Sequence, residues 1–401
     1  MVRVCLGLIP LALLISMPLT ALLIRASHRL GAYDSAGVPG QVKASRRRVP
    51  NTGGIALFWA IAVPIVLGVL SVAGMDASPT ADWRNDLTFL PADLHEHVAG
   101  IQKQTPMAIL LLGSLLLLHV LGLVDDRRPL GPWVKLAVMA VPATAIPLLF
   151  PDTRLLTLLD APAGGRWAST VVTVLWFLVV TNAMNFMDNM DGLAAGVAAV
   201  ASSLFLAATL ASPEPQWFVA ACLSLIVGAC LGFLWFNHPA RGPARVYMGD
   251  GGSLVIGFLL AFLTVRTTYV PAAGVGVRAG AWYGVLMPLV VLAVPLYDFA
   301  SVVVIRLSQG RSPFVGDTQH LSHRLVRRGL SVTAAVSVIH GLTAVTGAAG
   351  LLLASSRPWQ AVVIGGQVAL ILALVAVFEY ASPGGLPRER SASDRPSEPV
   401  P

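Results

Sequence analysis

The chain has 401 residues, of which 56% are hydrophobic and 12% are charged, and its mean hydropathy is +0.75. Soluble domains carry about 25% charged residues, so this composition excludes an ordinary soluble protein and indicates a polytopic membrane protein. The formal net charge of +7 does not indicate a nucleic-acid partner, because the basic residues are spread between apolar runs rather than gathered in one domain.

Apolar runs near the length that spans a bilayer predict an all-α protein with roughly eleven transmembrane helices. The expected ranges are 2–24, 55–74, 107–124, 133–151, 168–187, 194–211, 216–236, 251–266, 281–305, 331–355 and 359–380. The first run lacks a convincing small-x-small cleavage site, so we interpret it as a retained span rather than a signal peptide. One transmembrane domain over 1–381 is then followed by a Pro-, Ser- and charge-rich tail, 382–401, expected to be disordered.

Lysine and arginine are concentrated in the segments after the first and the ninth span. These residues are Arg25, Arg29, Lys43, Arg46, Arg47 and Arg48, and then Arg306, Arg311, Arg324, Arg327 and Arg328. The positive-inside rule predicts that both segments are cytoplasmic in a plasma (inner) membrane protein. An odd number of spans then puts the segments near 75–106, 152–167 and 267–280 outside. Every polar cluster described next falls on the cytoplasmic face.

The first polar cluster is VDDRRPLGPWVK, with Asp125 and Asp126 at the end of the third span and Lys135 at the start of the fourth. Adjacent carboxylates repel each other, so such a pair is stable mainly beside a cation. A phosphoryl-transfer site provides that environment. The simpler alternative is a charged turn in which the two following arginines neutralise the aspartates.

The second cluster is NAMNFMDNMDG, residues 182–192. Carboxylates near the hydrocarbon region cost about 2.5–3.5 kcal/mol each, which indicates a functional site. A spacing of three residues along a helix would let Asn182, Asn185, Asp188 and Asp191 face one cavity, and hard oxygen ligands suit Mg²⁺. Capping of the next helix is the alternative, but it would need one residue only.

The third cluster is VYMGDGGSL, residues 246–254. Its glycines, among them Gly251, allow the backbone to approach a ligand closely, and Asp250 and Ser253 stand where a helix N-terminus would present its amides to an anion. Asp250 is also a good metal ligand. A Gly-rich turn with an Asp cap is the alternative.

The fourth cluster is GDTQHLSHRL, residues 316–325. His320 and His323 have the spacing of zinc ligands, but no third and fourth soft ligand accompany them. Two imidazoles followed by Arg324 instead predict binding of an anion such as a pyrophosphate. A solvated charged loop stays open as the alternative.

Together the clusters resemble the polyprenyl-phosphate N-acetylhexosamine-1-phosphate transferases, glycosyltransferase family 4, which are related to the phospho-N-acetylmuramoyl-pentapeptide transferases. The resemblance covers about 50–330 and rests on PNTGG at 50–54, GLVDD ending at Asp126, NxxNxxDxxDGLAAG at 182–196, GFLWFN at 232–237, MGDGGSL at 248–254, PLYD ending at Asp298 and HLSHRL at 320–325. It implies a cytoplasmic-face active site and a Mg²⁺-dependent reaction, with Mn²⁺ as an alternative. A polyprenyl phosphate attacks the β-phosphate of a UDP-sugar, which yields polyprenyl-diphospho-sugar and UMP.

Two features of this chain depart from the family pattern. The segment 237–250 is longer than the usual spacing, and HLSHRL lacks the histidine triplet of the pentapeptide transferases. The second departure favours the simple UDP-N-acetylhexosamine branch, with N-acetylglucosamine first, over peptidoglycan-precursor synthesis. The expected role is the first membrane step of a cell-envelope polysaccharide such as lipopolysaccharide.

The resemblance, supported by side-chain chemistry, assigns expected roles to the residues. Asp250 and Asn185 are the expected metal ligands. The expected catalytic residues are Asp125, Asp126, Asp188, Asp191 and Lys135, and the expected substrate-binding residues are Asn182, His320, His323, Arg324, Gly251 and Ser253. One of the paired aspartates would orient or deprotonate the lipid phosphate. A two-step route through a covalent aspartyl intermediate stays open.

A proton-coupled secondary transporter is the alternative from a different class, because it too combines many spans with acids inside the membrane. Transporters place those acids near the bilayer midplane, whereas here they lie at the ends of spans, all on one side. We therefore expect an enzyme whose partners are a UDP-sugar, a polyprenyl (undecaprenyl) phosphate and the bilayer. A homodimer stays open.

Overall fold

The computed structural model describes residues 1–31, 33, 49–73, 75, 97–212, 215–268, 286–314, 316–353 and 356–380. Within these ranges the secondary structure is helical, and the β-pairing is limited to an isolated bridge between Ala240 and Gly242. Ten of the described helices are long and apolar enough to cross a membrane. This confirms the prediction of an all-α polytopic membrane protein. The basic residues 43–48 and the tail 382–401 lie outside the described residues.

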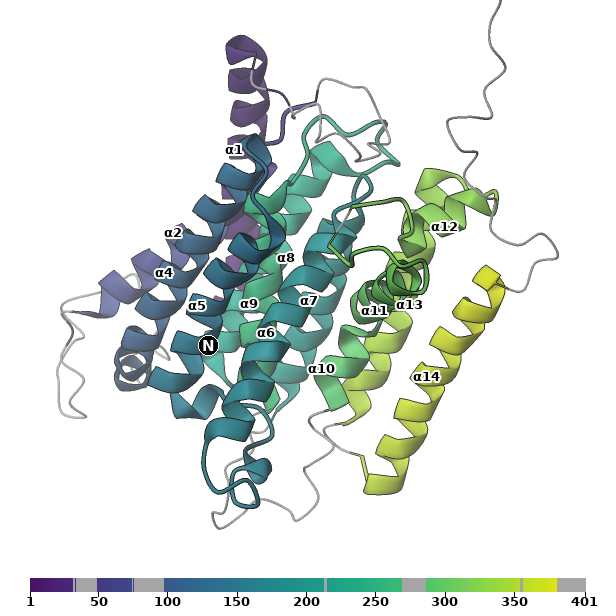
Figure 1. The fold of residues 1–401 in the computed structure, drawn as a ribbon. Helices are drawn as coiled ribbons and strands as arrows, with labels where there is room; N and C mark the ends of the chain where they lie inside the picture. Colours follow the sequence, from purple (N-terminus) through teal and green to yellow (C-terminus); the bar gives the residue numbers. More distant parts are fainter. Residues whose placement is uncertain are drawn as a thin grey trace, which may run out of the picture.

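Each long helix contains or overlaps a predicted apolar run, although α1 ends later than predicted and α4 begins earlier. They are α1 (Val2–Leu30), α2 (Gly53–Ala73), α4 (Val98–Arg127), α5 (Pro132–Leu149), α6 (Trp167–Met187), α7 (Leu193–Ala211), α8 (Trp217–Asn237), α9 (Asp250–Thr268), α13 (Val332–Leu353) and α14 (Pro358–Tyr380). Short 3-10 turns, η2 (Pro151–Thr153) and η3 (Thr157–Leu159), lie between α5 and α6. Figure 1 shows the long helices side by side in one bundle.

The predicted ninth span is interrupted. It consists of α10 (Leu286–Val291) and α11 (Ala293–Ser308), separated at Leu292. Pro295 has no backbone N–H to donate to the carbonyl of Val291, so the helix loses one bond of its ladder at this point. Neither piece alone has the length of a span. The two pieces in succession account for the difference between the ten long helices and the roughly eleven predicted spans.

Successive long helices run in alternate directions, which brings particular helix ends together. At one end of the bundle, the thiol of Cys5 in α1 contacts the carbonyl of Trp217 at the start of α8. At the other end, the hydroxyls of Ser27 in α1 and Thr52 before α2 lie 3.3 Å apart. The C-terminal ends of α4, α6 and α8 and the N-terminal ends of α5, α7 and α9 share the second end (Figure 1).

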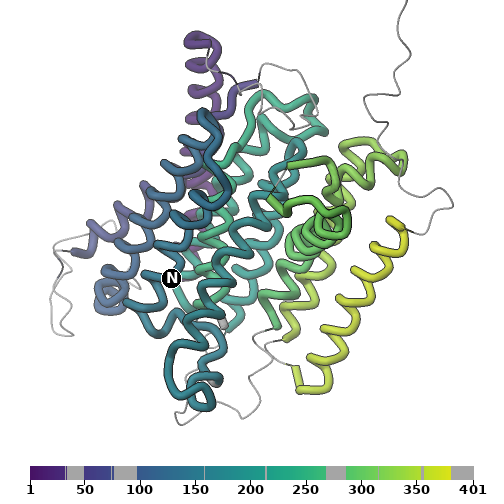
Figure 2. Tube along the Cα trace, in the orientation of Figure 1, coloured from purple at the N-terminus to yellow at the C-terminus, as the bar shows by residue number. Residues whose placement is uncertain are grey.

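α8 and α9 are the most buried of the spans, and α1 and α14 are the most exposed. Glycines let α9 pack closely on its neighbours: a Cβ at Gly122 would lie 2.3 Å from the backbone of Asp250, and one at Gly54 would lie 2.4 Å from the amide of Gly252. Small residues allow such backbone contact between membrane helices. Figure 2 shows α14, in yellow, at the edge of the bundle. The first turn of α9 is therefore the fixed point around which the polar residues gather.

Candidate active site

Lys135 joins two of the predicted clusters. Its ammonium donates to Asp125 Oδ2 at 2.9 Å and also to Asp250 Oδ2. Asp125 lies in the last turn of α4, Lys135 lies in the first turn of α5, and Asp250 begins α9, so one cation bridges carboxylates from two other helices. The second oxygen of Asp125 accepts the backbone N–H of Leu130 at 2.7 Å. The cation paired with Asp125 is therefore Lys135, not one of the arginines that follow it.

Asp126 has a different partner from Asp125, although the two are adjacent. Its carboxylate accepts the backbone N–H groups of Asp250 at 3.1 Å and of Gly251 at 3.4 Å. A carboxylate at a helix N-terminus satisfies amides that have no partner inside the helix and interacts favourably with the helix dipole. The two adjacent carboxylates therefore have different structural roles: Asp125 pairs with Lys135, and Asp126 caps α9.

The end of α6 supplies the next contacts. Asn185 Nδ2 donates to Asp250 Oδ1 and to Ser253 Oγ, both at 2.8 Å. Asn182, three residues earlier, donates to the carbonyl of Leu178 in its own helix at 2.7 Å. Asn185 and Ser253 therefore meet at Asp250, as the two sequence clusters suggested, while the amide group of Asn182 is bound within α6.

The sequence-based expectation that four residues of 182–191 share one helical face is wrong. α6 ends at Met187, so Asp188 and Asp191 lie in the turn that follows. Asp191 Oδ2 accepts the backbone N–H of Ala244 at 3.0 Å and so holds the 238–249 segment. Asp188 stays with the cluster: burial and the charges of Asp250 and Asp126 raise its pKa to about 8, although an N–H bond from Gly249 opposes the shift.

His119 belongs to the site, although the sequence analysis did not single it out. Its Nδ1 donates to the carbonyl of Gly251 at 2.7 Å, and its ring stacks on Phe58 with centroids 4.5 Å apart and planes at 5°. The ring is buried in the middle of an apolar helix. A polar side chain within an otherwise apolar run was the available signal. Its contact helps to set the first turn of α9.

The HLSHRL motif forms a short helix rather than a loop. α12 (Leu321–Arg327) begins after His320. Asp298 of α11 accepts the backbone N–H of Leu321 at 2.5 Å and pairs with His320 Nδ1 at 2.8 Å. His323 is neutral at pH 7, because burial and the nearby charges of His320 and Arg327 lower its pKa to about 4.

α12 lies against the cluster at the end of α6. The His320 ring meets Phe186 edge-on with centroids 5.4 Å apart, and Ser322 donates to Asn189 Oδ1. In the segment before α12, Phe314 contacts Trp133 of α5, with ring centroids 5.3 Å apart. All four predicted clusters therefore occupy one end of the bundle. The assigned roles of the individual residues stay predictions.

Arg324 is buried and bound within the protein. Its guanidinium donates to Glu379 at 3.0 Å, to Ser301 at 2.9 Å and to the carbonyl of Gln319. These partners raise the pKa of Arg324 despite its burial, the charge of Glu379 contributing most. The predicted contact of Arg324 with a diphosphate stays a prediction, whereas its contact with α14 is a feature that the sequence did not suggest.

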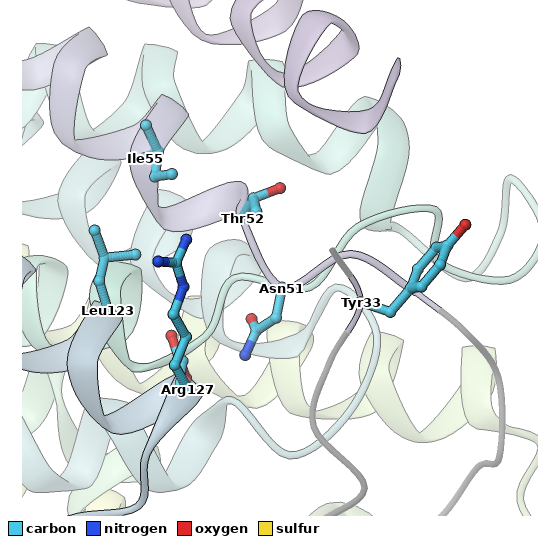
Figure 3. Close-up of a pocket in the computed structure, with 7 residues that line it drawn as sticks. Tyr33, Asn51, Thr52, Ile55, Leu123 and Arg127 are labelled. Atoms are coloured by element: carbon cyan, nitrogen blue, oxygen red, sulfur yellow. The ribbon is translucent and has the colours of Figure 1, made fainter. Parts of the chain in front are cut away.

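A pocket of about 60 Å³ opens beside Asp126. It lies between α4 and the segment before α2, and its lining residues are Tyr33, Asn51, Thr52, Ile55, Leu123, Asp126 and Arg127. Figure 3 shows the Arg127 side chain extending from α4 toward Thr52 and Ile55, with Asn51 beside it. The lining combines apolar side chains, Ile55 and Leu123, with polar and charged ones such as Asn51, Asp126 and Arg127. Such a lining suits a ligand with a charged head beside an apolar chain.

The residues present fit Mg²⁺. Among the described residues, no three His, Cys, Asp or Glu side chains converge closely enough to hold a metal ion alone. Mg²⁺ does not require such a set, because it binds one or two carboxylates together with substrate phosphates and waters. Rotation of the Asn185 amide would turn its oxygen toward Asp250, which gives two hard donors. Burial and, after it, the negative charges of Asp250 and Asp126 raise the pKa of Asp188, and a divalent cation would offset those charges.

Comparisons with known proteins give a consistent result. Residues 108–268 match the family model described as glycosyl transferase family 4. The chain is 26% identical over 382 residues to a probable undecaprenyl-phosphate N-acetylglucosaminyl 1-phosphate transferase of Bacillus subtilis, which covers 94% of this chain and 92% of that relative. It is 30% identical over 372 residues to the decaprenyl-phosphate N-acetylglucosaminephosphotransferase of Mycobacterium tuberculosis, and this match covers 88% of this chain and 83% of that relative. A phospho-N-acetylmuramoyl-pentapeptide-transferase of Lactiplantibacillus plantarum is 32% identical over 181 residues, and this match covers 42% of this chain and 55% of that relative.

Proposed function

Because this chain belongs to glycosyl transferase family 4, we propose that it transfers N-acetylglucosamine 1-phosphate, or a related N-acetylhexosamine 1-phosphate, from a UDP-sugar to a polyprenyl phosphate and releases UMP. The observation that carries the proposal is the meeting of Asp125, Lys135 and Asp250 at one end of a membrane bundle. The similarity to N-acetylglucosamine-phosphate transferases over most of the chain supports the substrate class. The pentapeptide transferase matches less than half of the chain, so that branch is the less favoured one.

The charge of the lipid substrate decides how much base catalysis the reaction needs. A phosphate monoester with a second pKa near 6 is mostly doubly ionised at pH 7, so it attacks the diphosphate without first losing a proton to the enzyme. The main requirement is then positive charge around the diphosphate oxygens as the bond to UMP breaks. Lys135 carries such a charge within the cluster, and its side chain is partly exposed. Asp125 and Asp250 hold its ammonium in place.

Magnesium belongs to the proposal as the expected cofactor. Asp250 and Asn185 would hold Mg²⁺ together with the substrate phosphates, and the ion would neutralise charge on the diphosphate. Asp126 would act indirectly, since its carboxylate sets the first turn of α9 and thereby the position of Asp250. Asp188 would also support Mg²⁺ binding through its charge, because a nearby cation favours the ionised form of its carboxylate.

We place the site on the cytoplasmic face of the plasma membrane. The support is the distribution of basic residues at the site end of the bundle. They include Arg25, Arg29, Arg127, Arg128, Arg241, Arg245, Arg306, Arg311, Arg327 and Arg328. At the opposite end the described basic residues are fewer, namely Arg3, Lys103, Arg154, Arg166, Arg266 and Arg357, and two of them, Arg154 and Arg266, are paired with Asp160 and Asp152. This bias agrees with the positive-inside rule and with a nucleotide substrate made in the cytoplasm.

The test is a direct assay of purified protein in detergent. Undecaprenyl phosphate, Mg²⁺ and a panel of UDP-sugars are supplied, and released UMP is measured together with the lipid product. We expect UMP only when lipid acceptor, UDP-N-acetylhexosamine and Mg²⁺ are all present. Release of UMP without a lipid product would identify a hydrolase instead, and no release with any member of the panel would refute the proposal. Proton-coupled uptake by the same protein in liposomes would favour the transporter.

A further inference from the structure

Glu379 is a buried carboxylate near the C-terminal end of α14, which is one of the two most exposed long helices. Its side chain has no exposed surface, although α14 as a whole faces outward along much of its length. Burial of an ionised carboxylate is unfavourable unless charged and hydrogen-bonding partners compensate for the lost water. A single acid at such a position therefore calls for an explanation beyond anchoring an apolar helix.

Both oxygens of Glu379 are used, and each binds a different helix. Oε1 accepts Nε of Arg324 in α12 at 3.0 Å, and Oε2 accepts the hydroxyl of Tyr297 in α11 at 2.7 Å. The backbone carbonyl of the same residue accepts Arg328, just after α12, and the Arg328 guanidinium lies 5.7 Å from the ring centroid of Phe378. The last turn of α14 is thus bound to the middle and to the C-terminal end of α12.

Arg324 transmits this contact toward the candidate active site. Its two remaining nitrogens donate to Ser301 in α11 and to the carbonyl of Gln319, directly before His320. Because each of the three guanidinium nitrogens donates a hydrogen bond, moving Arg324 would also disturb the start of α12 at Gln319. The start of α12 also contacts the candidate site, because Ser322 donates to Asn189 and the His320 ring meets Phe186.

We propose that Glu379 is a positioning residue for the sugar nucleotide: by holding Arg324 it fixes α12, and with it His320 and Ser322, against the end of α6. The inference rests on the proposed function. It extends the site to α14, which lies beyond the residues that match the family model. Glu379 itself contacts neither the carboxylate cluster nor Lys135, so it acts through its partners, Arg324 in α12 and Tyr297 in α11.

The first test separates an effect on the nucleotide from a general effect on the enzyme. Glu379→Gln keeps the size of the side chain and one carbonyl oxygen but removes the charge. We expect kcat/KM for the UDP-sugar to fall by about 10–100-fold, since a charge-assisted contact is weakened. The KM for polyprenyl phosphate should stay within about twofold of wild type. Gln367→Ala is the matched control, because Gln367 lies exposed on the same helix.

The second test asks whether Glu379 acts through Arg324. If it does, the double variant Glu379→Gln, Arg324→Gln should be no worse than the more damaging single variant, because the second change removes a contact already lost. Losses that multiply would show two independent roles and would overturn the proposal. A thermal unfolding curve of each variant in detergent checks that the comparison is made between folded proteins.

The third test reports on α12 without relying on activity. Trypsin cleaves after arginine, and Arg324 is buried while Arg328 is bound to α14. We expect cleavage between residues 324 and 328 to be at least about fivefold faster in Glu379→Gln than in wild type, because local opening exposes the backbone. Gln367→Ala should match wild type. Unchanged cleavage would overturn the positioning role while the proposed function stands.

The outcomes of these tests are distinguishable. A wild-type protein that releases no UMP with any UDP-sugar refutes the proposed function, and the positioning role falls with it. An active wild type, faster cleavage in Glu379→Gln and unchanged UDP-sugar kinetics would show a structural anchor only, which overturns the proposal. Faster cleavage together with a selective and non-additive loss of kcat/KM supports it.

Discussion

Replacement of Lys135 by methionine tests the centre of the proposed site. The ammonium of Lys135 is 2.9 Å from Asp125 Oδ2 and also contacts Asp250. At that distance two unit charges attract by about 6 kcal/mol at an effective dielectric constant of about 20. Desolvation offsets most of this attraction, and hydrogen bonds to charged groups contribute about 1.5–3 kcal/mol net. Methionine keeps the length and the apolar contacts of the side chain but removes the charge.

The expected cost is larger for catalysis than for stability. A preorganised donor that faces developing charge contributes about 10²–10³ in kcat, so Lys135→Met should lower kcat by about that factor. The change also leaves Asp125 and Asp250 without their cation, so the melting temperature should fall as well. Lys135→Arg should recover part of kcat, because it restores the charge but replaces a compact ammonium by a planar fork.

The assay is UMP release at varied UDP-sugar and Mg²⁺ concentrations, with Lys103→Met as the control. Lys103 lies exposed on α4, near the end opposite to Asp125. The control should behave as wild type. A Lys135→Met enzyme within about threefold of the wild-type kcat would refute the role of Lys135, since that difference corresponds to less than about 1 kcal/mol of barrier.

Four further outcomes are expected. Asp250→Asn should abolish turnover with little change in melting temperature, because the amide keeps the size and removes the charge proposed to hold Mg²⁺. His119→Ala should lower kcat and the melting temperature together, because the first turn of α9 loses a buried partner. A cysteine placed in 311–320 should be shielded from impermeant thiol reagents in intact cells, and one at Asp86, outside the described residues, should react. The pKa of His323 is lowered to about 4, whereas an unfolded histidine binds a proton near pH 6.5, so stability should fall as the pH drops from about 6.5 toward 4.

Each of these outcomes has a measurement that would contradict it. Near wild-type turnover of Asp250→Asn with unchanged Mg²⁺ dependence would remove that residue from the metal site. His119→Ala with wild-type kcat would leave the ring a purely structural role. Labelling of 311–320 from outside would reverse the orientation; the native cysteines are buried and give little background. A His323→Gln variant that loses as much stability on acidification as wild type would exclude that histidine as the cause.

The sequence alone determined the class of the protein and the extent of its spans. A transmembrane helix is specified locally, by about 20 apolar residues, so runs such as 168–187 and 194–211 predicted α6 and α7 to within a residue. The four polar clusters were also visible, because acids and amides at the edge of apolar runs stand out. Their meeting at one end followed from the alternation of spans.

The tertiary structure decided what each polar residue contacts. Asp125 and Asp126 are indistinguishable by composition, yet one pairs with Lys135 and the other caps α9, because only packing determines which atoms meet. Asp191 left the expected face because α6 ends at Met187. Helix ends depend on contacts with the rest of the fold, which apolar periodicity does not describe.

His119 and Glu379 show the same limit most clearly. In the sequence each is one polar residue in an apolar helix, and nothing local indicates a partner. Their partners are Gly251 for His119, and Arg324 with Tyr297 for Glu379, all on other helices. A membrane span is specified by its own hydrophobicity, whereas the pairing of buried polar groups depends on residues far away in the chain. The sequence therefore determined the bundle, and the packing of the bundle determined the site.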